Sequence, residues 1–215
     1  MNFIPEALDD YAVKHTSAEP ELLARLSRET FLKILQPRML SGHYQGRLLS
    51  MISKLVKPRR ILEVGTYTGY SALCLAEGLA EDGEIHTIDI NEELTEIQQK
   101  YINLSPFKNK IHTHLGAAAE IIPGIEGEFD IIFIDADKPN YPAYLDIIID
   151  KLRPGGILLT DNVLWSGKVI EKVSQDDLST IALLEYNRRI AEDDRFETIL
   201  LPVRDGLSIT RKKNS

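Results

Sequence analysis

The sequence predicts an α/β fold with a mainly parallel, seven-stranded sheet, helices on both faces, one antiparallel strand at the end and a helical N-terminal extension. From residue 60 onward, short apolar runs alternate with segments whose apolar residues recur every three or four positions. The 215 residues contain no Pro/Gly/Ser-rich linker and no repeat. We therefore expect a single domain over 1–215.

Two amphipathic helices are expected before the sheet. Within 20–35 and 43–56, leucines and isoleucines recur at three- and four-residue spacing, which is typical of helices with one apolar face. These helices could cap the sheet. We accordingly divide the domain into a helical N-terminal cap, 1–56, and a core, 57–215.

The core is expected to form alternating strands and helices. In order, these are the strand RILEV, the helix SALCLAEGLA, the strand EIHTIDI, a helix with Leu94, Ile97, Tyr101 and Leu104 on one face, the strand IHTHL, a short helix near 117–122, the strand FDIIFID, the helix AYLDIIIDKL after Pro142, the strand ILLTD, a helix near 177–192, and the strands ETILLP and LSITRK. Pro154, Gly155 and Gly156 are expected to end the helix before ILLTD. The last two strands should form a hairpin around Asp205–Gly206.

Composition narrows the class of protein. The net charge of -8 offers no overall basic footprint for long nucleic-acid contacts, although the tail Arg211–Lys213 is locally basic. The one cysteine, Cys74, cannot form an internal disulfide, and we expect it to be buried in a protein of a reducing compartment. No run approaches the roughly 18 apolar residues that span a bilayer, so we expect a soluble, cytoplasmic protein without a membrane partner.

Acidic residues close two of the apolar runs. Asp135 ends FDIIFID, and the pair Asp161–Asn162 follows GGILLT. If both runs are parallel strands of one open sheet, these side chains meet at its carboxyl edge, where such folds bind ligands. Two carboxylates and an amide suit a hard cation such as Mg²⁺, whereas the alternative for Asp161–Asn162 is an ordinary turn.

The segment ILEVGTYTGYSA joins the first strand to the first core helix and carries Gly65 and Gly69. It lacks the G-x-G-x-x-G spacing that lets a loop approach a pyrophosphate, because position 67 is tyrosine. Glu63 before the loop suits a free ammonium group, and Asp89 ends the next strand, where an acid can bind ribose hydroxyls. Together these residues point to an adenosyl cofactor without phosphates, S-adenosylmethionine (SAM), although the glycines alone would fit an ordinary turn.

Longer stretches resemble the cation-dependent class I O-methyltransferases, the family of catechol and caffeoyl-coenzyme A O-methyltransferases and their bacterial relatives. The matching stretches are MLSGHYQGRLL, LEVGTYTGYSAL, HTIDIN, FDIIFIDADKPNYPAYL, LRPGGILLTDNVLWSGKV and VRDGLSIT. They follow the family's order from about residue 39 to the end, and DADK with DNVLWSG is the most specific pair. The resemblance implies a Rossmann-like methyltransferase fold and suggests a homodimer.

The resemblance also assigns site residues. It places the cofactor against Met39, Ser41, Glu63, Gly65, Thr66, Tyr67, Ser71, Asp89, Gly116, Ala117, Ala118 and Asp135. It makes Asp135, Asp161 and Asn162 the ligands of a divalent cation, Mg²⁺ with Mn²⁺ or Ca²⁺ as alternatives, and Lys138 the catalytic base. A solvated surface lysine is the other interpretation of Lys138.

Methyl transfer to a phenolic oxygen requires loss of its proton, and a cation bound by two neighbouring hydroxyls would acidify and orient them. We therefore expect Mg²⁺-dependent methyl transfer from SAM to a small catechol-like acceptor, a vicinal diphenol or a caffeoyl-type compound. One alternative is an O-methyltransferase of 5-hydroxyuridine in transfer RNA, against which the negative net charge weighs. An alternative of another class is a non-catalytic SAM-binding or scaffold protein.

Five further residues have two interpretations each. His43 either faces the acceptor or is an exposed residue at a helix start. His112 and His114 alternate along a strand, where packing or solvent exposure is expected rather than metal binding. Trp165 either walls an aromatic acceptor or packs within its loop, and Arg204 either meets an acidic acceptor or lies on the surface.

Overall fold

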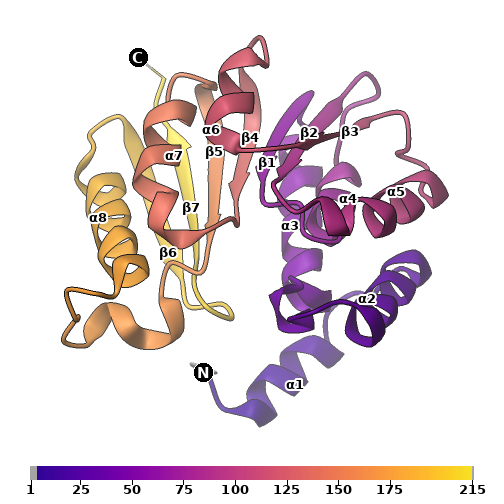
Figure 1. Ribbon diagram of the computed structural model, residues 1–215, viewed down its shortest axis with the longest axis horizontal. Coiled ribbons are helices and arrows are strands. Elements are labelled where there is room, and N and C mark those ends of the chain that lie inside the picture. Colours follow the sequence, from indigo (N-terminus) through magenta and orange to yellow (C-terminus); the bar gives the residue numbers. More distant parts are fainter. Residues whose placement is uncertain (1–3, 215) are drawn as a thin grey trace.

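The computed structural model describes residues 4–214 and contains one sheet, with the strand order β3–β2–β1–β4–β5–β7–β6 (Figure 1). The strands are β1 Arg60–Val64, β2 Glu84–Asp89, β3 Ile111–Leu115, β4 Phe129–Ile134, β5 Leu152–Asp161, β6 Phe196–Leu201 and β7 Leu207–Lys212. Strands β1 to β5 are parallel to one another in the sheet. In the described part of the chain, only β7 runs antiparallel to both of its neighbours, β5 and β6. The predicted sheet of seven strands with one antiparallel strand is confirmed.

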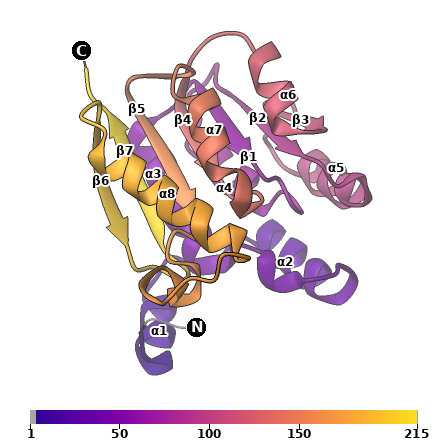
Figure 2. The same ribbon diagram turned by 60° about the vertical axis from the view of Figure 1, so that its left-hand side comes forward.

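Helices cover both faces of the sheet. They are α1 Glu6–Lys14, α2 Glu21–Lys33, α3 Gly42–Val56, α4 Tyr70–Ala76, α5 Thr95–Leu104, α6 Ala118–Ile121, α7 Tyr141–Ile148 and α8 Leu178–Glu192. Short 3₁₀ segments are η1 Pro37–Met39, η2 Glu92–Leu94, η3 Ile122–Gly124, η4 Lys138–Asn140 and η5 Trp165–Ile170. Helices α2 to α5 pack on one face and α6 to α8 on the other (Figure 2).

The central strands have apolar side chains on both faces. In β1, Ile61 packs in the cluster beneath α2 to α5, and its neighbour Leu62 packs in the cluster beneath α6 to α8. In β4, Phe133 and Ile134 divide in the same way. A parallel strand buried on both faces needs a continuous apolar run, which is why RILEV and FDIIFI show no polar alternation.

The prediction for the junction between α7 and β5 was wrong. Helix α7 contains Pro142 in its first turn and ends at Ile148, so Pro154–Gly156 does not terminate it. These residues lie inside β5, where the ladder to β4 shifts register and Gly155 has a φ of +74°. A β-bulge accommodates both a proline without an N–H and a left-handed glycine, so these residues bend the strand without ending it.

The N-terminal helices lie against the core helices. The predicted helices over 20–35 and 43–56 correspond to α2 and α3, and α1 precedes them. Helix α3 packs on α4, and α2 contacts both α4 and α5. Across the described residues, no helix combines the length and the apolar character needed to cross a membrane.

Candidate active site

The three predicted cation ligands meet at the carboxyl edge of the sheet. Asp135 directly follows β4, Asp161 is the last residue of β5, and Asn162 follows it with a φ of +61°. Strands β4 and β5 are neighbouring parallel strands in which Ile134 lies opposite Thr160. The residues that follow this pair are therefore adjacent.

The two carboxylates are poorly neutralised by the protein alone. Burial raises the pKa of Asp135, and the nearby charge of Asp161 raises it further, whereas Lys138 and Arg204 lower it. Burial likewise raises the pKa of Asp161, whose Oδ1 atom has no hydrogen-bond partner. A divalent cation would supply the missing charge and a partner for this oxygen, so the donor set of two acids and an amide fits a hard cation.

Lys138 lies beside the two carboxylates and is largely shielded from solvent. Its Nζ donates to Asp135 Oδ1 at 3.2 Å and to the carbonyl oxygen of Ala136 at 2.8 Å, and 12% of its side chain is exposed. The Nζ atom is also 5.4 Å from the ring centre of Tyr141 and 5.9 Å from that of Trp165. Trp165 thus packs beside the amine and shields it on one side.

The loop after β1 passes directly over the loop that carries Asp135. Gly65 donates its N–H to the carbonyl of Ile88 at 2.9 Å and has a φ of +105°. A Cβ at this position would overlap the backbone carbonyl of Asp135. Only glycine combines this conformation with this approach, so the predicted cofactor loop and the predicted cation loop are fixed against each other.

We expect Gly65→Ala to impair both loops. The added methyl group must displace the Asp135 carbonyl, and the left-handed conformation costs an additional 1–2 kcal/mol, roughly, for a non-glycine residue. The thermal unfolding midpoint should fall by several degrees, and the affinities for SAM and for Mn²⁺ should both decrease. Gly124→Ala is the matched control, because a Cβ there meets no atom within 4 Å. Wild-type affinities in Gly65→Ala would contradict this account.

Glu63 and Asp89 lie at the ends of β1 and β2 beside this loop. Glu63 is fully buried, and burial raises its pKa to about 8 against the lowering effect of the Ser71 and Thr87 hydroxyls. Its Oε1 atom has no hydrogen-bond partner, which fits a ligand that carries an ammonium group. Asp89 accepts the N–H of Tyr67 at 2.6 Å and of Asn91 at 2.8 Å, which fixes its carboxylate at the mouth of the loop.

The remaining predicted cofactor residues lie around the same edge. Gly116, Ala117 and Ala118 follow β3, and Gly116 donates its N–H to the carbonyl of Asp89 at 2.9 Å. Thr66 and Ser71 are buried in and after the glycine loop. From the cap, Ser41 is buried immediately before α3, whereas Met39 is 57% exposed.

A cavity of about 670 Å³ lies between the cap and this edge. Helices α1 to α3 contribute one wall, which includes His43, and Asn162, Ser166 and Arg204 contribute the other. His43 is the second residue of α3 and its Nε2 lies 2.7 Å from the carbonyl oxygen of Ser17. The volume is typical of pockets for small molecules, and its wall includes one of the predicted cation ligands.

The histidines of the edge strands form a separate cluster. The ring centre of His86 on β2 is 5.1 Å from that of His112 and 5.3 Å from that of His114. Burial lowers the pKa of His86 and of His114, so both favour the neutral form. Among the described residues, no three or more His, Cys, Asp or Glu side chains are arranged to hold a metal ion, and the predicted cation site has only two such residues beside Asn162.

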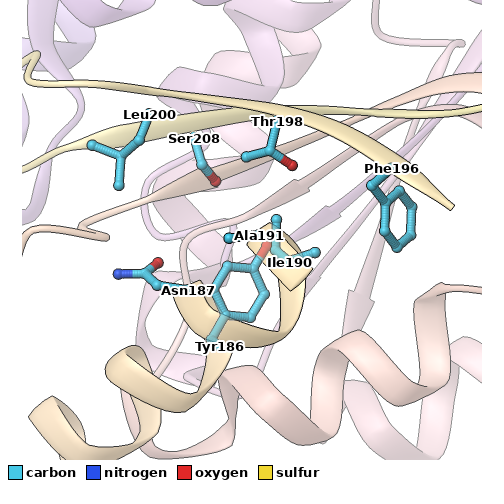
Figure 3. Close-up of a pocket in the computed structure, with 8 residues that line it drawn as sticks. All are labelled: Tyr186, Asn187, Ile190, Ala191, Phe196, Thr198, Leu200 and Ser208. Carbon is cyan, nitrogen blue, oxygen red and sulfur yellow. The ribbon is translucent and has the colours of Figure 1, made fainter. Parts of the chain in front are cut away.

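A smaller cavity of about 250 Å³ lies away from this edge, between α8 and the β6–β7 hairpin (Figure 3). Tyr186 and Ile190 reach it from the helix, and Leu200 and Ser208 reach it from the strands. None of its lining residues is a predicted site residue.

Two residues near the cation ligands were not among the predicted site residues. Gln45 in α3 is buried near Asp161 and accepts from Arg204 through Oε1, and its amide nitrogen has no hydrogen-bond partner. Asp205 accepts from the Asn162 side chain, although its sequence context indicated only a hairpin turn. A tertiary contact of this kind leaves no local pattern in the sequence.

Most of the chain, residues 13–213, matches the protein family described as O-methyltransferase. Caffeoyl-CoA O-methyltransferase 1 of Arabidopsis thaliana is 36% identical over 205 residues, which cover 90% of this chain and 79% of the plant protein. Caffeoyl-CoA O-methyltransferase 5 of Nicotiana tabacum is 35% identical over 205 residues, covering 90% of this chain and 85% of the relative.

Solved structures agree with this match. The O-methyltransferase from Bacillus cereus, solved in complex with SAH, has a TM-score of 0.89 and 28% identity, covering 96% of this chain and 97% of the other. The SAH-bound methyltransferase PaMTH1 from Podospora anserina has a TM-score of 0.88 and 28% identity, with complete coverage of both chains.

Proposed function

Because this chain belongs to the O-methyltransferase family and is a SAM-dependent O-methyltransferase, we propose that it methylates one hydroxyl of a small catechol-like or caffeoyl-type acceptor with the help of a divalent cation, Mg²⁺ in the first place. The observation that carries the proposal is the pair of under-neutralised carboxylates, Asp135 and Asp161, beside Lys138.

Asp135, Asp161 and Asn162 would hold the cation. When bound, it would lower the pKa of an acceptor hydroxyl and orient the acceptor. Lys138 would receive the hydroxyl proton at Nζ as a neutral amine, released from its ion pair with Asp135, and the side chain is largely shielded from solvent. Trp165 beside it would exclude water from one side of the acceptor.

The cofactor would lie along the glycine loop. SAM supplies an electrophilic methyl group on a sulfonium when bound. Glu63 would pair with its ammonium group, Asp89 would accept from its ribose hydroxyls, and Gly116–Ala118 would border its adenine. The open space at Gly69 supports this placement, because a Cβ there would meet no atom within 4 Å.

The 670 Å³ cavity between the cap and Asn162 supports a small-molecule acceptor. The caffeoyl-CoA O-methyltransferases among the relatives are consistent with an acceptor of the phenolic class. Apolar side chains that remain exposed on the cap, including Leu35 and Leu55, support a homodimer.

The proposal predicts cation-dependent turnover of small diphenols. Purified protein with SAM should methylate catechol or caffeate, lose activity with EDTA, and regain it on addition of Mg²⁺, Mn²⁺ or Ca²⁺, as followed by mass spectrometry. Transfer RNA from a strain that lacks this protein serves as the comparison acceptor. Turnover that EDTA does not change would contradict the cation, and methylation of the RNA alone would contradict the acceptor.

A further inference from the structure

The turn between β6 and β7 contacts both the cation loop and the N-terminal cap. It is a tight turn in which Gly206 donates its N–H to the carbonyl of Val203 at 2.9 Å. Arg204, in its centre, has a φ of +50°, a conformation that disfavours a side chain. A strained residue in a turn is retained where its contacts outweigh the strain, and both Arg204 and Asp205 make hydrogen bonds to other segments.

Asp205 binds the loop that carries the cation ligands. Its Oδ1 accepts the N–H of Ser166, its Oδ2 lies 3.5 Å from the amide nitrogen of Asn162, and its carbonyl accepts the N–H of Leu164 at 3.0 Å. The loop itself has three left-handed residues that are not glycine, Asn162, Trp165 and Ser166. It therefore depends on outside contacts to keep its shape.

The contact with Asn162 determines which way its amide faces. Because Nδ2 donates to Asp205, the Oδ1 atom is directed to the other side of the amide plane. A cation ligand must present this oxygen and not the nitrogen. Asp205 therefore selects the amide orientation in which Asn162 can coordinate.

Arg204 binds the cap. Its guanidinium donates to the carbonyl oxygens of Leu40, at 3.1 Å, and of Ser41, and to Oε1 of Gln45 at 3.0 Å. Because Gln45 accepts from Arg204 through its oxygen, its amide nitrogen is directed to the other side of the amide plane, where it has no hydrogen-bond partner. Neighbouring residues of one turn thus bind the loop of one cation ligand and the cap.

We propose that Asp205 is a positioning residue for the cation site, because it orients the Asn162 amide, and that its neighbour Arg204 supports this turn by holding it to the cap. The inference rests on the proposed function, because it takes Asn162 as a cation ligand. Groups behind first ligands commonly change metal affinity by 10- to 100-fold, roughly, when they are replaced.

The decisive variant is Asp205→Asn. The substitution keeps an acceptor for the N–H of Ser166 but turns a second NH₂ group toward Asn162, so the Asn162 amide loses its partner. Titration of Mn²⁺ in the presence of SAH, with free Mn²⁺ followed by electron paramagnetic resonance, should show affinity about tenfold weaker than in the unaltered protein. SAH affinity, measured by calorimetry, should stay within about twofold, since Asp205 does not contact the cofactor residues.

Asp193→Asn is the matched control. Asp193 precedes β6, at the other end of that strand, and accepts from the backbone and side chain of Arg195, so it has the same chemistry away from the site. This variant should bind Mn²⁺ like the unaltered protein. Arg204→Gly, which relieves the left-handed strain but releases the cap, should weaken both Mn²⁺ and SAH binding by about fivefold or more.

Exchanging the side chains at 162 and 205 tests whether the direction of their hydrogen bond matters. Asn162→Asp combined with Asp205→Asn restores one donor facing one acceptor and should regain Mn²⁺ affinity, whereas Asn162→Asp alone sets two carboxylates against each other and should not. The comparison of the double variant with Asn162→Asp alone remains informative even if Asp205→Asn lowers the unfolding midpoint. Failure of the unaltered protein to bind Mn²⁺ would contradict the proposed function. Unaltered protein that binds Mn²⁺ while Asp205→Asn binds it equally well, or an exchange that restores nothing, would overturn the inference alone.

Discussion

Asp161→Ala is expected to abolish cation-dependent methyl transfer and to leave cofactor binding largely intact. Asp161 is 4% exposed, and its Oδ1 atom lacks a hydrogen-bond partner. Removing the carboxylate therefore breaks few contacts within the protein. Loss of a charged ligand should lower turnover by roughly 100-fold or more, which corresponds to about 3 kcal/mol of transition-state stabilisation. The glycine loop and Glu63 are untouched.

The measurement is turnover at saturating Mg²⁺ together with the dissociation constant for SAH. Asp176→Ala is the control, because Asp176 is an exposed aspartate in the loop before α8. Tyr141 should still donate to the backbone carbonyl of residue 161 in the variant, so the end of β5 keeps its support. Unchanged cation-dependent turnover in Asp161→Ala would refute its assignment as a ligand.

The strands and the residues that end them could be predicted because each depends on local pattern. FDIIFI and ILLT are continuous apolar runs, as a strand buried on both faces requires, and a ligand edge follows from their parallel order. Pro154–Gly156 was predicted wrongly because its residues are typical of turns, whereas the ladder to β4 retains them in a bulge. Local composition does not reveal which neighbouring strand will hold a segment.

The groups behind the ligands could not be predicted from the sequence for a related reason. Arg204 meets Ser41 and Gln45 across about 160 residues of chain, and the contact depends on the conformation of one turn. Likewise, the sequence predicts a tight turn at Gly65. It does not reveal that the Asp135 carbonyl occupies the space that a side chain at position 65 would need. Residues that contribute chemistry had local motifs, and residues that position them did not.

Glu63→Gln should make the cofactor-free protein more stable at alkaline pH while it weakens SAM binding. The folded-state pKa of Glu63, about 8, lies above its ordinary value of 4.5. Between these values the folded state binds more protons than the unfolded state, so stability falls as pH rises from 4.5 to 8. In this interval the free energy of unfolding falls by at most about 1.4 kcal/mol for each pH unit. Glutamine removes the buried charge and therefore this loss.

Thermal unfolding at pH 6 and pH 9, with and without SAM, measures both effects. The midpoint of the unaltered protein should fall toward pH 9 and recover with SAM, since an ammonium group beside Glu63 would compensate its charge. In Glu63→Gln the fall should be smaller, though not absent, because burial also raises the pKa of Asp135 and Asp161. SAM affinity should drop by about tenfold, as expected for loss of a buried charged partner. Glu84→Gln is the control with the opposite shift, because His86 and Arg60 lower the pKa of Glu84. If Glu63→Gln bound SAM like the unaltered protein, the buried carboxylate would have no part in holding the cofactor.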